Sequence, residues 1–301
     1  MGIKVIHVYE LITSSILVDI EFESLGPWKL YSFREVLELP VIDTIKWYMC
    51  RKIKQLLEKK QFLAIEGTVG AGKSTLIENY IQPYWNEAYH SEEANEEVKI
   101  IPEAALSDEM RPKLKELYEE KITLLEFQEI IESKYFEVLC EQILFDKREK
   151  GRYLLDRSQI STIIFSKKGE LSSKEIKRIK KNREYFDEVI KKGHIIFIKS
   201  TRERVLKNKM IRARKEEEAT TIKFLEELHD AYYYLMRKAY KPIIVHGTSI
   251  IETISIIDNS KNINSSKNRK TLRKQVRKVV NEAIDEIISR SLNEEEFENS
   301  H

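Results

Sequence analysis

The chain has 301 residues, of which 42% are hydrophobic and 34% charged, so one large domain with a sizeable core is expected. Lys and Arg number 52 against 50 Asp and Glu, and this net charge of +2 argues against a chain that binds nucleic acid or membrane surfaces along its whole length. The two cysteines, Cys50 and Cys140, exclude a disulfide scaffold and a cysteine-based metal site, and they favour a reducing, cytoplasmic location.

The first 60 residues precede any recognisable motif and are expected to form an N-terminal extension. Lys4 to Glu23 alternates apolar and polar residues, which predicts a hairpin or two strands. Tyr31 to Lys60 has a largely helical pattern that is interrupted near Pro40. No apolar run in the chain reaches the about 18–20 residues of a membrane span, so no membrane association is expected.

From residue 61 to residue 258, segments typical of strands alternate with segments typical of helices. Helical patterns over Leu114–Lys150, Ser172–Lys192 and Arg202–Tyr240 separate the later strands. This alternation predicts an α/β fold, a parallel sheet with helices on both faces that binds ligands at the carboxyl ends of its strands. The predicted strands are Phe62–Ile65, Val98–Ile101, Arg152–Leu155, His194–Lys199 and Pro242–Val245.

Residues 259–301 are expected to form a linker and a basic helical tail. Lys261 to Asn281 holds eight Lys or Arg and no acidic residue, while apolar residues recur at helical spacing from Leu272 to Ile288. An amphipathic helix with this pattern is expected to bury its apolar stripe against protein. Because the tail carries no catalytic motif, truncation after Asp258 is expected to leave kcat within about threefold.

A phosphate-binding loop follows the first predicted strand of this region. The stretch Gly67–Ser74 fits the pattern G-x-x-x-x-G-K-S. Its glycines let several backbone N–H groups point at one anion, and the following helix adds its positive end. Lys73 is expected to reach the β- and γ-phosphates of ATP or a related donor, and Ser74 to hold Mg²⁺. The expected nucleotide-binding residues are Gly67, Thr68, Val69, Gly70, Ala71, Gly72, Lys73, Ser74 and Thr75.

Charged side chains follow the next two predicted strands. Glu103 is suited to accept the proton of an alcohol that attacks a phosphoryl group. Asp156 is suited to hold Mg²⁺, partly through water, and Arg157 offers planar hydrogen-bond donors to phosphate. Further along, Arg212 and Arg214 would neutralise charge on the transferred group if both closed over it.

Together these motifs resemble the deoxynucleoside kinase family over about residues 62–258. The resemblance implies a P-loop three-layer sandwich with a five-stranded parallel sheet, an ATP-type donor with Mg²⁺, and usually a homodimer. It also implies phosphorylation of the 5′-hydroxyl of a deoxynucleoside, a reaction of nucleotide salvage. The matching segments are Ile65–Thr75, Pro102-Glu103, Phe127-Gln128, Asp156–Ser158, Arg212–Glu217 and Phe224–His229.

The resemblance also carries residue roles over by position. Glu103 becomes the general base on the 5′-hydroxyl. Gln128, with Phe127 beside it, becomes the amide that hydrogen-bonds the edge of the base. The other roles fall to Arg157 near the 5′-oxygen and phosphates, Asp156 at Mg²⁺, Glu217 at the 3′-hydroxyl, and Arg212 and Arg214 in a lid.

The base-binding positions depart from the family pattern. Thr162 and Tyr135 stand where some members carry an Asp and an Arg that read an exocyclic amine, and Asn208 stands where an Arg is usual in the lid. Gln128 can pair with N3–H and O4 of thymine without a charged helper. Thymidine or deoxyuridine is therefore expected ahead of deoxyadenosine.

Two other functions fit parts of the sequence. A thymidylate kinase-like nucleoside monophosphate kinase would share the phosphate loop, but its acceptor is already ionised and needs no base such as Glu103. An ATP-dependent nucleic-acid-binding protein would use the basic segment Lys261–Asn281, which leaves nucleic acid open as a partner. No aromatic residues are interleaved with those cations, as single-strand binding would favour.

Overall fold

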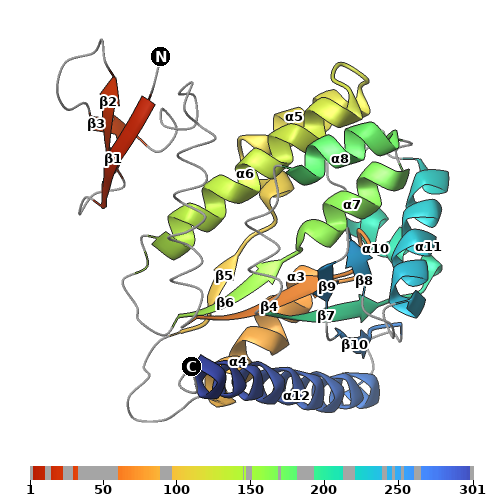
Figure 1. Ribbon diagram of the computed structural model, residues 1–301. Helices are drawn as coiled ribbons and strands as arrows, with labels where there is room; N and C mark the ends of the chain where they lie inside the picture. Colours follow the sequence, from red (N-terminus) through yellow and green to blue (C-terminus); the bar gives the residue numbers. More distant parts are fainter. Residues whose placement is uncertain are drawn as a thin grey trace.

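The computed structural model describes most of the chain after residue 60 and three short strands before it (Figure 1). Strands β1 (Ile3–Glu10), β2 (Ser15–Phe22) and β3 (Leu30–Ser32) form an antiparallel sheet, which confirms the strands predicted within Lys4–Glu23. The helix predicted after residue 31 lies mostly outside the described residues. Those residues are 3–10, 15–22, 30–32, 60–88, 97–144, 146, 151–168, 171–181, 193–212, 221–238, 243–245, 248–251, 254–260 and 266–298.

A five-stranded sheet with every neighbouring pair parallel forms the centre of the molecule. Its order is β10-β7-β4-β6-β5. The central strands are almost entirely buried, because apolar runs without alternation suit strands that are covered on both faces. The sheet confirms the predicted α/β fold. Its strands are β4 (Gln61–Glu66), β5 (Lys99–Ile101), β6 (Arg152–Asp156), β7 (Gly193–Lys199) and β10 (Ile254–Asp258).

The prediction of the fifth strand was wrong. Residues Ile243–Val245 form β8, which pairs antiparallel with β9 (Thr248–Ile251) in a separate two-stranded sheet. The edge position beside β7 belongs instead to β10. The two runs of the small sheet are two residues apart in the sequence, a spacing that favours local hairpin pairing over insertion into the parallel sheet.

Helices cover both faces of the central sheet, which gives the three-layer sandwich (Figure 1). One face carries α12 (Ser266–Glu298), α3 (Lys73–Leu76), a π-helical turn (Ile77–Ile81) and α4 (Gln82–Ala88). In the described part of the chain, no helix is both long and apolar enough to cross a membrane. The other face carries α5 (Met110–Tyr118), α6 (Leu124–Leu144), α7 (Gln159–Lys168) and α8 (Ser173–Lys181), with α11 (Ile222–Lys238) against α7 and α10 (Arg202–Arg212) against α11.

Helix α12 packs its apolar face into the main core rather than standing apart from it. It contacts β10, β7, α4 and the π-helical turn. Burying one Val, Leu or Ile side chain contributes about 1.5–3 kcal/mol, so the stripe contributes on the order of 10 kcal/mol. The residues of the stripe are Leu272, Val276, Val279, Val280, Ala283, Ile284 and Ile287.

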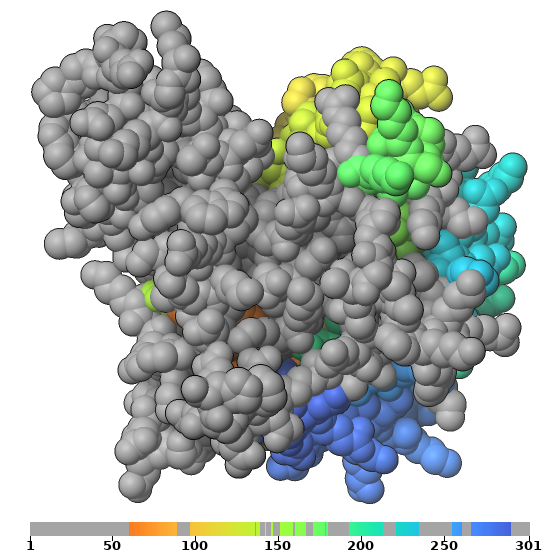
Figure 2. Space-filling model, viewed as in Figure 1, coloured from red at the N-terminus to blue at the C-terminus, as the bar shows by residue number. Residues whose placement is uncertain are grey.

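The basic residues of α12 lie on its opposite, solvent-facing side. Lys270, Lys274 and Lys278 are exposed, and Figure 2 shows the helix along the lower edge of the molecule. Arg273 and Arg277 lie over the rings of Tyr80 and Tyr84, at 5.8 and 6.0 Å from the ring centres. The predicted amphipathic helix is therefore present, and nucleic acid as its partner stays a prediction.

Candidate active site

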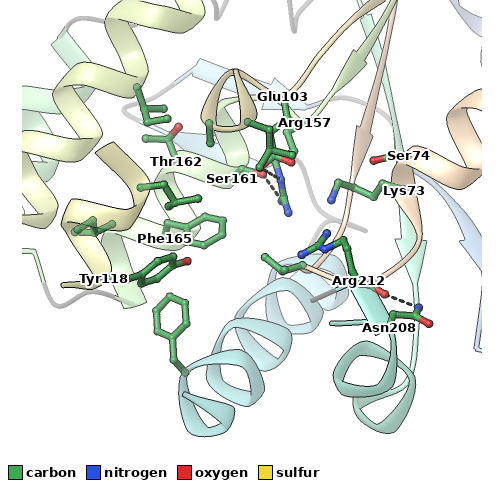
Figure 3. Close-up of a pocket in the computed structure, with 18 of the residues that line it drawn as sticks. Lys73, Ser74, Glu103, Tyr118, Arg157, Ser161, Thr162, Phe165, Asn208 and Arg212 are labelled. Carbon is green, nitrogen blue, oxygen red and sulfur yellow. Dashed lines mark hydrogen bonds and ion pairs between the residues drawn. The ribbon is translucent and has the colours of Figure 1, made fainter. Parts of the chain in front are cut away.

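A cavity of about 780 Å³ lies at the carboxyl ends of the strands (Figure 3). The chain reaches it where β4 passes into the phosphate loop, where β5 is followed by Glu103, and where β6 is followed by Arg157. Helix α6 supplies the far wall. It begins with a capping box in which Thr123 and Glu126 hydrogen-bond each other's backbone and side chains, so the start of this wall is fixed.

The phosphate loop has the backbone that its glycines predict. Gly70 and Gly72 have φ angles of 80° and 91°, values that side-chain-bearing residues rarely adopt. A Cβ on Gly70 would lie 2.6 Å from the carbonyl oxygen of Val205, so α10 can approach closely because this residue is a glycine. Of the predicted nucleotide-binding residues, Val69, Gly70, Gly72, Lys73, Ser74 and Thr75 line the cavity, while Gly67, Thr68 and Ala71 shape the loop behind them.

Three cationic side chains converge at this end of the cavity. Figure 3 shows the charged ends of Lys73, Arg157 and Arg212 pointing toward one another from three different elements. Burial lowers the pKa of Lys73, and the neighbouring charge of Arg157 lowers it further. Because close like charges repel, this cluster is suited to hold a polyanion such as the phosphates of a nucleotide.

Ser74 and Asp156 meet as the sequence predicts for a Mg²⁺ site. The Ser74 hydroxyl donates a 3.1 Å hydrogen bond to Oδ2 of Asp156. The other carboxylate oxygen, Oδ1, is buried and has no hydrogen-bond partner among the described residues. No cluster of three His, Cys, Asp or Glu side chains occurs in that part of the chain. Mg²⁺ is usually bound by one or two protein oxygens together with substrate phosphates and water. Ser74 and Asp156 supply such oxygens, so the residues fit this ion.

Glu103 and Arg157 form an ion pair beside the cationic cluster. Nε of Arg157 donates to Oε1 of Glu103 over 2.7 Å, and the two side chains are 2% and 15% exposed. Burial is the largest single influence and opposes the charge of Arg157, but the acidic groups around it, Glu103 first among them, together outweigh burial and raise the pKa of Arg157, which therefore stays a cation. Arg157 also has a φ of 77°, an unusual value for a residue with a side chain, and its N–H donates to the carbonyl of Ile65 at 3.0 Å.

The opposite end of the cavity is mostly apolar. Phe127 and Gln128 on α6 are both buried and line it, and Gln128 is 4% exposed. Thr162 and Tyr135 line the same end. Phe165 faces the cavity, whereas its neighbour Ser166 is buried elsewhere. The apolar wall is completed by Leu106, Leu114, Leu117, Leu124 and Ile131.

The predicted lid is described in part. Arg212, the last residue of α10, is exposed and lines the cavity, while Arg214 and Glu217 lie outside the described residues. Asn208 lies one turn before Arg212, and its side-chain amide donates a 2.7 Å hydrogen bond to the carbonyl of Gly70. This bond ties α10 to the phosphate loop.

Sequence reasoning missed several residues of the site. Arg204 lines the cavity at a helical spacing of four from Asn208 and eight from Arg212, a periodicity that is readable in the sequence. Asn259 lies directly after β10, and its side-chain N–H donates to the carbonyl of Ala71 at 2.8 Å. Asn259 was missed because the fifth strand was predicted at Pro242–Val245, so no strand end was expected directly before it. Three buried residues that contact Arg157 or its neighbours, namely Glu66, Ser161 and Tyr232, gave no signal.

Comparisons with known proteins agree with this fold. The profile of the family described as deoxynucleoside kinase matches residues 63–281, past residue 258 and into α12. A comparison with curated protein sequences finds no significant match. Among solved structures, deoxyadenosine kinase from M. mycoides with bound dCTP is similar with a TM-score of 0.50 at 18% identity, covering 73% of this chain and 99% of that chain. The same enzyme with bound dATP gives a TM-score of 0.50 at 17% identity, covering 73% and 98%.

Proposed function

The chain belongs to the deoxynucleoside kinase family, and on that premise we propose that it transfers the γ-phosphoryl group of ATP to the 5′-hydroxyl of a deoxynucleoside. One observation carries the proposal. A carboxylate, Glu103, borders the same cavity as the cations Lys73, Arg157 and Arg212. An alcohol acceptor needs a base, and a triphosphate donor needs concentrated positive charge.

In this reaction Glu103 accepts the proton of the 5′-hydroxyl as the oxygen attacks the γ-phosphorus. The O–H bond breaks, the bond from the 5′-oxygen to phosphorus forms, and the bond from phosphorus to the β–γ bridging oxygen breaks, so that ADP leaves. Arg157 is paired with Glu103, and this contact keeps the carboxylate oriented before the acceptor arrives.

The cations stabilise the charge of the transferred group. Lys73 follows the glycines of the phosphate loop and reaches the β- and γ-phosphates, while Arg212 with Arg214 acts from the lid. Ser74 and Asp156 would hold Mg²⁺, which would supply further positive charge to the phosphates of the donor. Gln128, Phe127 and Thr162 bind the base, and Glu217 contacts the 3′-hydroxyl.

The mostly apolar end of the cavity, where the base of the acceptor would bind, favours a pyrimidine whose hydrogen-bonding edge carries no exocyclic amine. Gln128 is an amide with one acceptor and two donors, and Thr162 and Tyr135 beside it are neutral. A neutral set of this kind matches N3–H and O4 of thymine or uracil. Thymidine or deoxyuridine is therefore proposed ahead of deoxyadenosine, and a homodimer is proposed from the family.

The experiment is an acceptor panel with radiolabelled γ-phosphate. The purified chain is incubated with ATP, Mg²⁺ and each deoxynucleoside or its 5′-monophosphate, and products are separated by chromatography. The proposal predicts a labelled 5′-monophosphate, with thymidine or deoxyuridine fastest. Labelled diphosphate formed from monophosphates alone would assign the chain to nucleoside monophosphate kinases, and ATP hydrolysis stimulated by nucleic acid without any labelled acceptor would refute kinase activity.

A further inference from the structure

A chain of buried polar side chains surrounds the guanidinium of Arg157. Its Nη1 donates to the hydroxyl of Tyr232 at 2.7 Å, to Oγ of Ser161 at 3.0 Å and to the carbonyl of Gly67 at 3.0 Å. Tyr232 and Ser161 also contact each other over 2.7 Å. The side chain of Ser161 then donates to Oε2 of Glu66 over 2.8 Å.

The directions of these hydrogen bonds follow from counting protons. The backbone N–H and the hydroxyl of Ser158 both donate to Oε1 of Glu66, so this carboxylate acts as an acceptor. The single hydroxyl proton of Ser161 is used toward Glu66, so Ser161 accepts from the hydroxyl of Tyr232. Tyr232 in turn accepts from Arg157. The chain therefore runs in one direction, from the cation through two hydroxyls to a buried carboxylate.

In this arrangement, the Nε and Nη1 donors of the Arg157 guanidinium are all engaged by protein acceptors. Nε is directed to Glu103 and Nη1 to three acceptors, while Nη2 has no hydrogen-bond partner among the described residues. Arg157 lines the cavity, so its Nη2 donors are the ones available to a bound substrate. Burying hydroxyls and a carboxylate costs free energy unless each is hydrogen-bonded, and such satisfied networks hold one orientation rigidly.

We propose that Tyr232 and Ser161 are positioning residues that fix the guanidinium of Arg157, so that Nη2 meets the 5′-oxygen and transferred phosphoryl group while Nε holds Glu103. This assignment rests on the proposed phosphoryl transfer. Tyr232 is on α11, the helix that follows the lid segment, and Ser161 is on α7 behind the acceptor. The pair therefore joins the two sides of the cavity at the reacting atoms.

The test compares two neighbouring tyrosines. Tyr232→Phe keeps the ring, which lies 6.1 Å from Phe197, and removes the hydroxyl alone. It leaves Nη1 with two other acceptors, so no donor is stranded. The matched control is Tyr233→Phe, which removes a hydroxyl that donates to the carbonyl of Ser200 at 3.0 Å. We expect Tyr232→Phe to lower kcat about tenfold with both KM values within about twofold, and Tyr233→Phe to leave kcat within about twofold.

A double-variant cycle separates positioning from a general loss of structure. Ser161→Ala interrupts the same chain, so Tyr232→Phe combined with Ser161→Ala should lose little more kcat than the worse single variant. The assignment would be overturned if the effects of the two variants on kcat multiplied as independent effects do. It would also be overturned by equal kcat in Tyr232→Phe and Tyr233→Phe, or by a rise in KM at unchanged kcat. A wild-type chain that phosphorylates no deoxynucleoside would refute the proposed function itself, and the assignment with it.

Discussion

The two ends of the active-site cavity are built in opposite ways. At the reacting end, Lys73, Glu103 and Arg157 are charged and come from the segments that follow three strands. Glu103 and Arg157 are held by an ion pair to each other, and Arg157 also by a hydrogen bond to Tyr232 on α11. At the base end, apolar side chains from α5, α6 and α7 form the wall, and Gln128 and Thr162 are among its few polar groups. At the reacting end, several contacts fix the orientation of the charged side chains. At the base end, the shape of the apolar wall is the main feature.

Turnover rate and acceptor selectivity are therefore expected to depend on different ends of the cavity. Stabilising a developing charge requires a few groups in fixed positions, so changes at the reacting end should lower turnover for every acceptor alike. Discrimination among bases is a difference of affinities set by contacts and volume, so changes at the base end should alter the ranking of acceptors. The variants below test this separation.

Removing α12 should have the largest effect, because it supports both ends together. Truncation after Asp258 removes the buried stripe that includes Val276 and Val280. This loss is on the order of 10 kcal/mol, against a net stability of about 5–15 kcal/mol for an ordinary domain. We expect the truncated chain to lack a cooperative thermal transition by circular dichroism, contrary to the near-normal turnover that the sequence alone suggests.

Milder variants of α12 provide the control for truncation. Val276→Ala on the buried face should lower the free energy of unfolding by about 2 kcal/mol, and Lys274→Ala on the exposed face should change it by less than about 0.5 kcal/mol. A truncated chain that melts like the full one would show that the stripe does not stabilise the core.

Lys73→Ala should abolish most turnover with every acceptor. The variant removes the cation at the phosphate loop, and we expect kcat to fall on the order of 10³-fold while the fold is retained. Lys223→Ala, at an exposed position of α11, is the matched loss of charge and should leave kcat unchanged. Transfer of labelled γ-phosphate measures both, and near-normal kcat in Lys73→Ala would contradict the reading of this loop.

Gln128→Leu should alter selectivity more than rate. It removes an amide from the buried wall at similar volume, and two lost hydrogen bonds of about 1 kcal/mol each predict roughly a 30-fold fall in kcat/KM for thymidine. The fall for an acceptor that does not use both bonds should be smaller. Competition between thymidine and deoxyadenosine measures the ratio, and an unchanged ratio would remove Gln128 from base recognition.

Asn208→Ala should have the smallest effect of the series. The variant loses one hydrogen bond to the carbonyl of Gly70, worth about 1 kcal/mol, so KM for ATP should rise about fivefold. The neighbouring exposed Lys207 gives the control variant Lys207→Ala, for which KM should not change. A larger effect at Lys207 than at Asn208 would show that charge in α10, not its contact with the phosphate loop, matters.

The residues predicted for the reacting end line one cavity in the structure, because their positions follow from short local patterns. The glycine pattern, the strand-end carboxylates and Arg157 are each readable within a few residues, and the parallel sheet brings them to one edge. The family assignment and the α/β fold are confirmed for the same reason. Short sequence motifs, combined with the rule that parallel strands end at one edge of the sheet, are enough to place these residues.

The remaining features depend on contacts between distant segments. Asn259 was predicted to begin a linker because residues 259–268 are rich in Asn, Ser and Lys, whereas its place at the site follows from the pairing of Ile254–Asp258 with the distant strand β7. Tyr232 lies 75 residues from Arg157 and has no pattern of its own. The division of the chain at residue 258 followed composition, whereas burial of α12 depends on the shape of the sheet beneath it.

The most direct test of the separation between the two ends combines one variant from each. Glu103→Gln and Gln128→Leu are assayed with thymidine, deoxycytidine and deoxyadenosine, with kcat and deoxynucleoside affinity measured separately. We expect Glu103→Gln to lower kcat about 10²-fold, by the same factor for all three acceptors and at unchanged affinity, and Gln128→Leu to change the order of the three acceptors. A Glu103→Gln variant that reorders the acceptors, or a Gln128→Leu variant that slows all three equally, would contradict it.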